Sequence, residues 1–269
     1  MAVTSDAVAA LLADPSSAVV AVDFDGTLAP IVSRPQDARP APGAVDALTA
    51  LAARIGAVAI VSGRAAEEVL GLAGLTAQSG IQVLGHYGLQ SWREGSLTTP
   101  APVEGVGRAR ARLAELLATA DPGVQTEDKT HSVAVHTRGA ADPTAALAAL
   151  RPALLELAAD CDLEAVPGRY VIELRPRGVD KGEALRRLVT DSGARTVIYL
   201  GDDLGDLPAY AEVERLRRDA AVSGLTVAVA DPADPDSPRE VAARADLVLA
   251  GPVAAVAWLA GLADMLDAG

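Results

Sequence analysis

The chain has 269 residues, a formal net charge of −13 and a single cysteine, Cys161. This length is enough for one or two domains with a large core. The negative charge argues against a nucleic acid or an anionic membrane as a partner, and one cysteine excludes an internal disulfide framework.

Residues 1–6 carry no basic cluster, so we expect no signal peptide and a cytoplasmic protein. A helix is predicted over residues 6–13. Residues 18–22 then form a short apolar run, which is typical of a strand buried on both faces in a parallel sheet. The residues that follow it are Asp23, Asp25, Gly26 and Thr27. Open α/β sheets bind ligands beyond the carboxyl ends of their strands, so this turn is a candidate site, although an ordinary polar turn fits equally well.

The same strand pattern returns further along the chain. Residues 29–42 contain four prolines and predict an irregular loop, and residues 43–54 predict a helix. Residues 58–61 predict a buried strand that leads into Ser62, Gly63 and Arg64. A helix with Glu67 and Glu68 in its first turn is expected next, and then a strand over residues 81–84.

From about residue 98 the pattern changes. Helices are predicted over residues 103–119 and 143–159, and strands that look open to water on one face over residues 131–138, 163–166 and 170–174. We interpret this segment as a small α/β domain with an antiparallel sheet, inserted into the larger domain. The expected division is 1–97 and 180–269 for the larger domain and 98–179 for the insertion.

The larger domain resumes with a helix that Lys181 opens. A buried strand over residues 197–200 leads into Asp202, Asp203 and Asp206, and further strands are expected at 227–229 and 247–249. The uncharged stretch 247–263 is slightly short for a membrane span and is interrupted by Gly251-Pro252, so we expect a strand followed by a helix over 253–266.

If these strands are neighbours in one sheet, five carboxylates meet at its edge: Asp23, Asp25, Asp202, Asp203 and Asp206. Two like charges about 4 Å apart repel by about 4 kcal/mol at an effective dielectric near 20, so such a cluster needs a cation. Oxygen ligands without His or Cys favour Mg²⁺ or a similar ion.

Four ordered stretches resemble the motifs of the haloacid dehalogenase-like (HAD) phosphatases: Asp23-Phe24-Asp25-Gly26-Thr27, Ser62, Lys181 and Gly201-Asp202-Asp203-Leu204-Gly205-Asp206. The resemblance implies an α/β fold, with a HAD-like Rossmannoid core built on a parallel sheet and the inserted α/β domain as a cap. It also implies that Asp23 is the nucleophile and forms an aspartyl-phosphate. Asp25 would be the acid and base, starting protonated because neighbouring carboxylates favour that form.

Further roles follow from the same resemblance. Ser62 and Lys181 would contact the phosphate, and Gly26, Thr27, Gly63 and Arg64 are expected to line the substrate site. Mg²⁺ would be held by Asp23, Asp202 and the backbone carbonyl of Asp25, with Asp203 and Asp206 as further metal-binding candidates. A helix cap is an additional reading of Ser62, and a solvated helix residue is the alternative for Lys181.

Nearly the whole chain is similar to the trehalose-6-phosphate phosphatases. Glu127-Asp128-Lys129 with His136-Thr137-Arg138, and Gly168 with Glu173, match the cap patterns of that family. The resemblance implies that Glu127, Lys129 and Glu173 hydrogen-bond the distal sugar of trehalose 6-phosphate, in trehalose biosynthesis. Surface charges on an exposed sheet face are the alternative.

One stretch departs from the family, which usually has Gly-x-His-Gly-x-Glu. Here Tyr87 stands in place of the His and Gln90 in place of the Glu. Another sugar phosphate, such as sucrose phosphate or a mannosyl phosphoglycerate, therefore stays an alternative substrate, and a non-catalytic sugar-phosphate sensor is an alternative of another class. A phosphomutase is a third. We expect a monomer whose partner is a small sugar phosphate.

Overall fold

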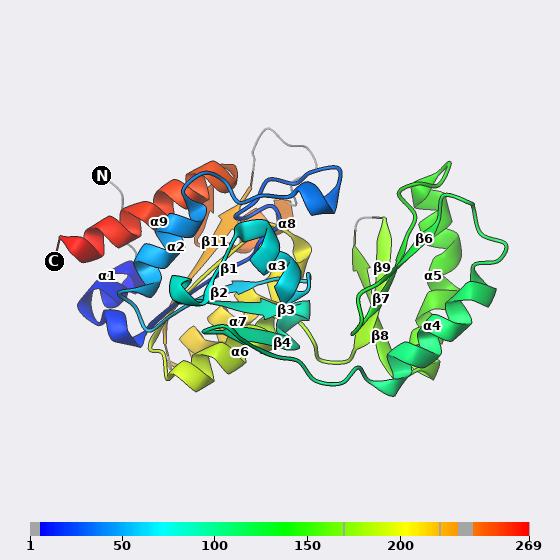
Figure 1. Cartoon of the computed structure of the whole chain (residues 1–269), viewed down its shortest axis with the longest axis horizontal. Helices are drawn as coiled ribbons and strands as arrows, with labels where there is room; N and C mark the ends of the chain where they lie inside the picture. Colours follow the sequence, from blue (N-terminus) through cyan, green and yellow to red (C-terminus); the bar gives the residue numbers. More distant parts are fainter. Residues whose placement is uncertain (1–5, 169, 221, 231–238, 269) are drawn as a thin grey trace. The chain divides into compact units, whose positions relative to one another are not determined.

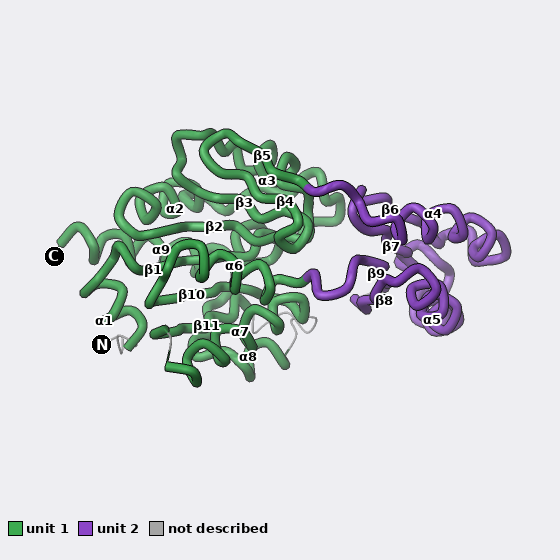
Figure 2. The backbone as a smooth tube through the Cα atoms, turned by 90° about the horizontal axis from the view of Figure 1, so that it is seen from below, with its two compact units in different colours: residues 1–99, 180–269 green, residues 100–179 purple. Residues whose placement is uncertain are grey.

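The computed structural model describes residues 6–168, 170–220, 222–230 and 239–268. The chain forms two compact units (Figure 2): unit 1 is Met1–Thr99 with Asp180–Gly269, and unit 2 is Pro100–Val179. The first boundary falls after Thr99 because residues up to 98 still pair with the sheet of unit 1. The expected absence of a signal peptide was based on residues 1–6, of which residues 1–5 lie outside the described residues.

Unit 1 is built on an eight-stranded sheet (Figure 1). The strands in spatial order are β12 (Leu247–Leu249), β11 (Ser223–Val229), β10 (Thr196–Gly201), β1 (Ala18–Val22), β2 (Ala57–Val61), β3 (Ile81–Gly85), β4 (Gln90–Arg93) and β5 (Ser96–Thr98). All pairs from β12 to β3 are parallel, and β4 and β5 are antiparallel additions at one edge.

Helices cover both faces of this sheet. On one face lie α1 (Asp6–Ala13), α2 (Ala44–Ala52), α3 (Ala66–Ala73) and α9 (Gly251–Asp267), packed against Val20 and Val22 of β1. On the other lie α6 (Lys181–Ser192), α7 (Leu207–Arg218) and α8 (Arg239–Arg244), packed against Val19 and Ala21. Side chains alternate along a strand, so an entirely apolar strand such as β1 supplies both cores.

The order of the strands in the sheet of unit 1 indicates where a ligand would bind. From β1 the chain adds β2 and β3 on one side, and later β10, β11 and β12 on the other. The strand order therefore reverses between β1 and β10, which pair in parallel with Val22 opposite Leu200. Ligands of open α/β sheets bind at the carboxyl ends of the strands at such a point. Asp23 directly follows β1, and Asp202 directly follows β10.

Unit 2 has a four-stranded antiparallel sheet in the order β6 (Gln125–Asp128), β7 (Val133–His136), β9 (Val171–Pro176) and β8 (Leu163–Gly168). Its two helices are α4 (Glu104–Leu116) and α5 (Pro143–Asp160). Val133, Val135, Ile172 and Leu174 pack against these helices. The opposite face, named the polar face of unit 2, carries Glu173, which alternates with Ile172 and Leu174 along β9. The other residues of this face are Glu127, Glu164 and Arg175, with Ala134 and Val166 between them.

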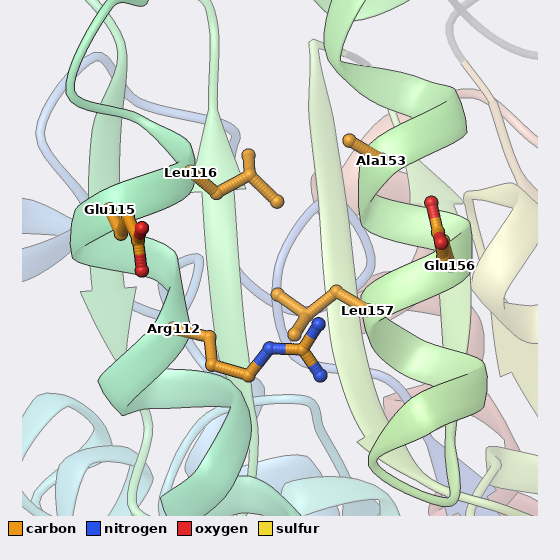
Figure 3. A pocket seen from close by; sticks show the side chains of 6 residues that line it. All are labelled: Arg112, Glu115, Leu116, Ala153, Glu156 and Leu157. Carbon is orange, nitrogen blue, oxygen red and sulfur yellow. The ribbon is translucent and has the colours of Figure 1, made fainter.

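A groove of about 260 Å³ lies between α4 and α5 (Figure 3). Its walls are Arg112, Glu115 and Leu116 from α4 and Ala153, Glu156 and Leu157 from α5. The groove belongs to the helical side of unit 2. None of the residues expected to bind sugar lines it.

The expected fold class is confirmed, with a largely parallel sheet and a separate antiparallel sheet. The sequence did not predict β4 and β5, because residues 90–98 are mostly polar and contain no apolar run. A signal for them exists in Glu94-Gly95, whose φ angles of 52° and 85° form a tight hairpin turn. The strand expected over 131–138 is shorter, Val133–His136, and the proline-rich loop contains a 3₁₀ turn, Pro35–Asp37. Four more 3₁₀ turns are described: Pro15–Ser17, Ala77–Ser79, His86–Gly88 and Leu204–Asp206.

Across the described part of the chain, no helix has the length and apolar character needed to cross a membrane. The uncharged stretch 247–263 forms β12 and most of α9.

Candidate active site

Lys181 and two carboxylates form the buried centre of the site. Lys181 is the first residue of α6, and its Nζ donates to Oδ1 of Asp23 and to Oδ1 of Asp206, each at 2.7 Å. All three side chains are buried. Burial alone would lower the pKa of Lys181, but the charges of Asp206 and Asp23 raise it well above its usual value. The ammonium therefore stays charged beside the expected nucleophile.

Asp206 orients this centre. Its Oδ1 also accepts a hydrogen bond from Oη of Tyr199 at 2.7 Å, and its Oδ2 accepts from the backbone N–H groups of Asp202 at 3.0 Å and Asp203 at 3.1 Å. The carboxylate thus receives four hydrogen bonds, counting that from Lys181, and is completely buried. We interpret Asp206 as the residue that fixes Lys181 and the loop after β10. The sequence reasoning missed Tyr199, although a hydroxyl within a buried strand needs a partner.

The side chain of Asp202 is contacted by residues of the stretch 23–27. Oγ1 of Thr27 donates to Oδ1 of Asp202 at 3.1 Å, and the side chain of Thr27 is completely buried. A Cβ on Gly26 would lie 2.0 Å from Oδ2 of Asp202, and φ of Gly26 is +86°. Only glycine therefore allows the two loops to meet. In the structure, the hydroxyl of Thr27 therefore orients the carboxylate of Asp202.

Three carboxylates could hold a metal ion. Oxygen atoms of Asp23, Asp202 and Asp206 lie within 4.8 Å of one another. Burial and the charges of Asp206 and Asp203 raise the pKa of Asp23 to about 8, against the opposing effect of Lys181. Burial, followed by the charge of Asp23, also raises the pKa of Asp202 well above its usual value. A cation removes this repulsion, so the site fits the metal ion expected from the sequence.

The other two expected carboxylates lie outside this group of three. The side chain of Asp203 is exposed and accepts a hydrogen bond from the N–H of Gly205 at 2.8 Å, as the cap of the 3₁₀ turn Leu204–Asp206. Asp203, expected as a further metal-binding candidate, therefore caps this turn in the structure. Asp25 faces Arg64: Nε of Arg64 lies 2.6 Å from Oδ2, and Nη2 lies 2.7 Å from Oδ1. The neighbour of Asp25 is therefore a guanidinium, where the sequence suggested further carboxylates.

Residues 62–64, which follow β2, are held in place by contacts with the segment after β3. Ser62 is buried and its Oγ accepts from the N–H of Arg64 at 3.2 Å, while the backbone carbonyl of Ser62 accepts from the N–H of Tyr87 at 2.9 Å. The ring of Tyr87 lies against Gly63, since a Cβ there would stand 2.7 Å from Oη. Ser62, Gly63 and Arg64 are thus fixed beside the first motif, and Tyr87 is in direct contact with them.

The side chain of Gln90 stabilises the start of α3. Its Oε1 accepts a hydrogen bond at 2.7 Å from the N–H of Ala66, the first residue of α3, and the Gln90 side chain is buried. The N–H groups at the start of a helix have no partner within the helix, so a side-chain oxygen stabilises this end. In the sequence, Gln90 stands in place of the Glu of the family pattern and keeps another sugar phosphate open as a substrate. The structure instead uses its amide oxygen to anchor α3.

The expected sugar-binding residues form one cluster on the polar face of unit 2. Nζ of Lys129 lies 3.4 Å from Oε2 of Glu173 and 3.9 Å from Oε2 of Glu127. Oγ of Ser132 donates to Oε1 of Glu173 at 2.5 Å, and Nε2 of His136 lies 2.9 Å from Oε2 of Glu127. Glu173 is buried and Glu127 is exposed. The structure therefore brings Glu127, Lys129 and Glu173 together.

Comparisons with known proteins find relatives over most of this chain. A family model described as trehalose-phosphatase matches residues 21–245, which span both units. A trehalose-phosphate phosphatase of Mycobacterium avium is 37% identical over 265 residues, which cover 92% of this chain and 62% of that protein. A trehalose-phosphate phosphatase of Mycolicibacterium paratuberculosis is 36% identical, with the same coverage. The chain thus spans about 62% of the length of these curated relatives.

Solved structures show the same fold. The C-terminal domain of a Candida albicans trehalose-6-phosphate phosphatase superposes with a TM-score of 0.76 at 22% identity, covering 96% of this chain and 95% of that one. A haloacid dehalogenase-like hydrolase of Bacteroides thetaiotaomicron has a TM-score of 0.60 at 15% identity, covering 94% and 99%. At these identities the likeness concerns the fold alone.

We predict that a divalent cation stabilises the protein more at pH 8 than at pH 6. The pKa of Asp23 is raised to about 8 in the metal-free protein. Between about pH 4 and about pH 8 the folded state therefore holds a proton that the unfolded chain has released, and the free energy of unfolding falls as the pH rises. A bound cation displaces this proton and restores stability, by about 2.7 kcal/mol at a hundredfold excess over Kd.

The measurement is the Tm in EDTA and in excess magnesium chloride at the two pH values. A Tm increase at pH 6 that equals or exceeds the increase at pH 8 would contradict the prediction.

We predict that Gln90→Met lowers the free energy of unfolding by about 1–3 kcal/mol, because the N–H of Ala66 loses its acceptor while buried. Gln90→Glu keeps an oxygen at the start of α3, where negative charge is favourable, and loses less than half as much. Urea denaturation of both variants measures the difference. A Met variant as stable as the unmodified protein would show that this cap is unimportant.

Proposed function

The chain belongs to the trehalose-phosphatase family, and on this premise we propose that it is a Mg²⁺-dependent phosphatase that hydrolyses trehalose 6-phosphate to trehalose and phosphate. The observation that supports this most is the buried contact between Asp23 and Lys181 beside Asp202, at the point where the strand order reverses. It joins a nucleophile, a fixed positive charge and a metal-binding carboxylate. We further expect a cytoplasmic monomer.

Mg²⁺ would be held by Asp23, Asp202 and the backbone carbonyl of Asp25, with Asp206 orienting the loop behind them. When bound, the ion supplies positive charge that offsets the repulsion between an anionic nucleophile and an anionic phosphate. Hard oxygen ligands without nitrogen or sulfur suit this ion.

In the first step an oxygen of Asp23 bonds to phosphorus as the bond from phosphorus to the sugar oxygen breaks. Asp25 gives a proton to that departing oxygen. Lys181 lies 2.7 Å from Asp23 and compensates negative charge on the nucleophile and on the transferred group. The hydroxyl of Ser62 donates to a phosphate oxygen. The product of this step is trehalose, with the phosphoryl group on Asp23.

In the second step a water oxygen bonds to phosphorus as the bond from phosphorus to Asp23 breaks. Asp25 takes the proton of this water, and phosphate leaves with Asp23 restored. The split into two steps replaces one very slow hydrolysis by two easier reactions.

Recognition of the sugar is assigned to the polar face of unit 2. Glu127, Lys129 and Glu173 offer acceptors and donors that suit a polyol, since each satisfies several hydroxyls. The amide oxygen of Gln90 is bound to the N–H of Ala66, so this oxygen contributes to the start of α3. Tyr87, in contact with Gly63, is the other difference from the family at this place.

We predict phosphate release from trehalose 6-phosphate in the presence of Mg²⁺, with a kcat/KM at least about tenfold above those for sucrose 6-phosphate, glucose 6-phosphate and mannosyl phosphoglycerate. Such a ratio corresponds to about 1.4 kcal/mol of selective transition-state binding. Asp23→Asn removes the nucleophile and is expected to abolish turnover.

Preference for another of these esters would change the substrate and keep the mechanism. Binding of the sugar phosphates without any release would indicate a sensor. Turnover by Asp23→Asn near the normal rate would overturn the role of Asp23.

We predict that Glu173→Gln raises KM for trehalose 6-phosphate by about 10- to 100-fold, since hydrogen bonds to a charged group contribute about 1.5–3 kcal/mol. Hydrolysis of p-nitrophenyl phosphate, which has no sugar, should change little. Glu164→Gln, which alters a carboxylate of β8 that pairs with Arg175, is the control within unit 2. Equal losses with both substrates would show that Glu173 supports the fold and does not select the sugar.

A further inference from the structure

Arg64 joins Asp25 to the first turn of α3. Its Nε and Nη2 donate to the two oxygens of Asp25 at 2.6 and 2.7 Å, and its Nη1 pairs with Glu68. The guanidinium carbon also lies 5.8 Å from the centre of the Phe24 ring. The side chain of Arg64 is only 12% exposed. The guanidinium is therefore fixed by two carboxylates and an aromatic face.

The paired contact restrains the carboxylate of Asp25. Two parallel N–H···O bonds between a guanidinium and a carboxylate fix both the distance and the plane of the carboxylate, which a single ammonium does not achieve. Each carboxylate oxygen can accept two hydrogen bonds, and Arg64 uses one on each. Within the part of the chain that the structure describes, no other residue donates to these oxygens, so one accepting position on each oxygen of Asp25 stays available in a defined direction.

We infer that Arg64 is a positioning residue, which holds the carboxylate of Asp25 for the second step of the proposed reaction. This inference rests on the proposed function. In that step the water oxygen bonds to phosphorus, the bond from phosphorus to Asp23 breaks, and the proton of the water passes to an open position on Asp25. A base that is already correctly oriented lowers the activation free energy of this step, because no side-chain freedom has to be lost to reach the reactive geometry.

Glu68 completes the arrangement. It lies four residues after Arg64, in the first turn of α3, and its carboxylate holds the Nη1 end of the guanidinium. The position of Asp25 is in this way tied to α3, whose start is in turn anchored by Gln90.

The test separates the two chemical steps with p-nitrophenyl phosphate and Mg²⁺. Its leaving group departs without a proton, so the first step does not need Asp25, whereas the second step does. Rapid mixing of the full chain with this ester measures an initial burst of p-nitrophenolate and the later steady-state rate. For Arg64→Ala we expect a burst of about one equivalent, with a rate within about threefold of the unmodified protein. The steady-state rate should fall by about 10- to 100-fold, as for a misplaced general base.

Companion variants sharpen this result. Asp25→Asn should show the same burst with an equal or larger steady-state loss, and the double variant Asp25→Asn/Arg64→Ala should lose nothing more. Arg64→Lys keeps the charge without the paired contact and should recover only part of the rate. Arg195→Ala is the matched control, because Arg195 pairs with Asp14 and its side chain is 73% exposed. It should behave like the unmodified protein.

Burst and steady-state rates that fall together in Arg64→Ala would overturn the inference, since Arg64 would then bind substrate or support the fold. An unchanged steady-state rate would overturn it as well. If Arg64→Ala does not fold, Arg64→Lys and Glu68→Gln serve the same comparison, and each is expected to lower the steady-state rate more than the burst. No phosphate release by the unmodified protein from any ester would instead overturn the proposed function, and with it this role of Arg64.

Discussion

The ammonium group of Lys181 lies 2.7 Å from an oxygen of Asp23 and 2.7 Å from an oxygen of Asp206, and the arrangement of the site depends on this buried contact. Leaving one partner of a buried ion pair uncompensated typically costs about 3–5 kcal/mol, so the buried ammonium of Lys181 requires a carboxylate beside it. Asp206 extends the contact to Tyr199 and to the backbone after β10. The same positive charge that stabilises the fold stands beside the expected nucleophile, which links stability to chemistry.

The topology explains how these residues meet. Asp23 follows β1, and Asp202 follows β10, the neighbouring parallel strand. A helix that leads into a parallel strand runs against the strand direction, so α6 begins at the carboxyl edge of the sheet, with Lys181 as its first residue. The side chain of Asp180 caps this start by accepting from the N–H of Glu183 at 2.8 Å. The site thus needs only the order of the strands and the capped start of one helix.

The dependence of the site on strand order explains which of its residues could be predicted from the sequence. Buried strands that end in polar residues are visible as patterns, and they correctly placed Asp23 and Asp202 at one edge. Contacts that depend on how separate loops pack are not visible. The pairing of Arg64 with Asp25 crosses 39 residues, and Gln90 reaches Ala66 only because β4 folds back beside β3. The sequence predicted that Arg64 lines the substrate site and marked Gln90 as a departure from the family pattern, since charge and position alone cannot distinguish a ligand contact from an internal one.

The central claim is that Asp23 takes the phosphoryl group covalently. The most direct measurement is intact-mass analysis of Asp25→Asn, quenched in acid during turnover of p-nitrophenyl phosphate with Mg²⁺ and followed by peptide mapping, because the leaving group of this ester departs without a proton from Asp25. Without the base the second step is slow, so the account predicts a mass increase of one phosphoryl group on the peptide that carries Asp23. A phosphoryl group on any other residue, or phosphate release by this variant without a covalent adduct, would contradict the account.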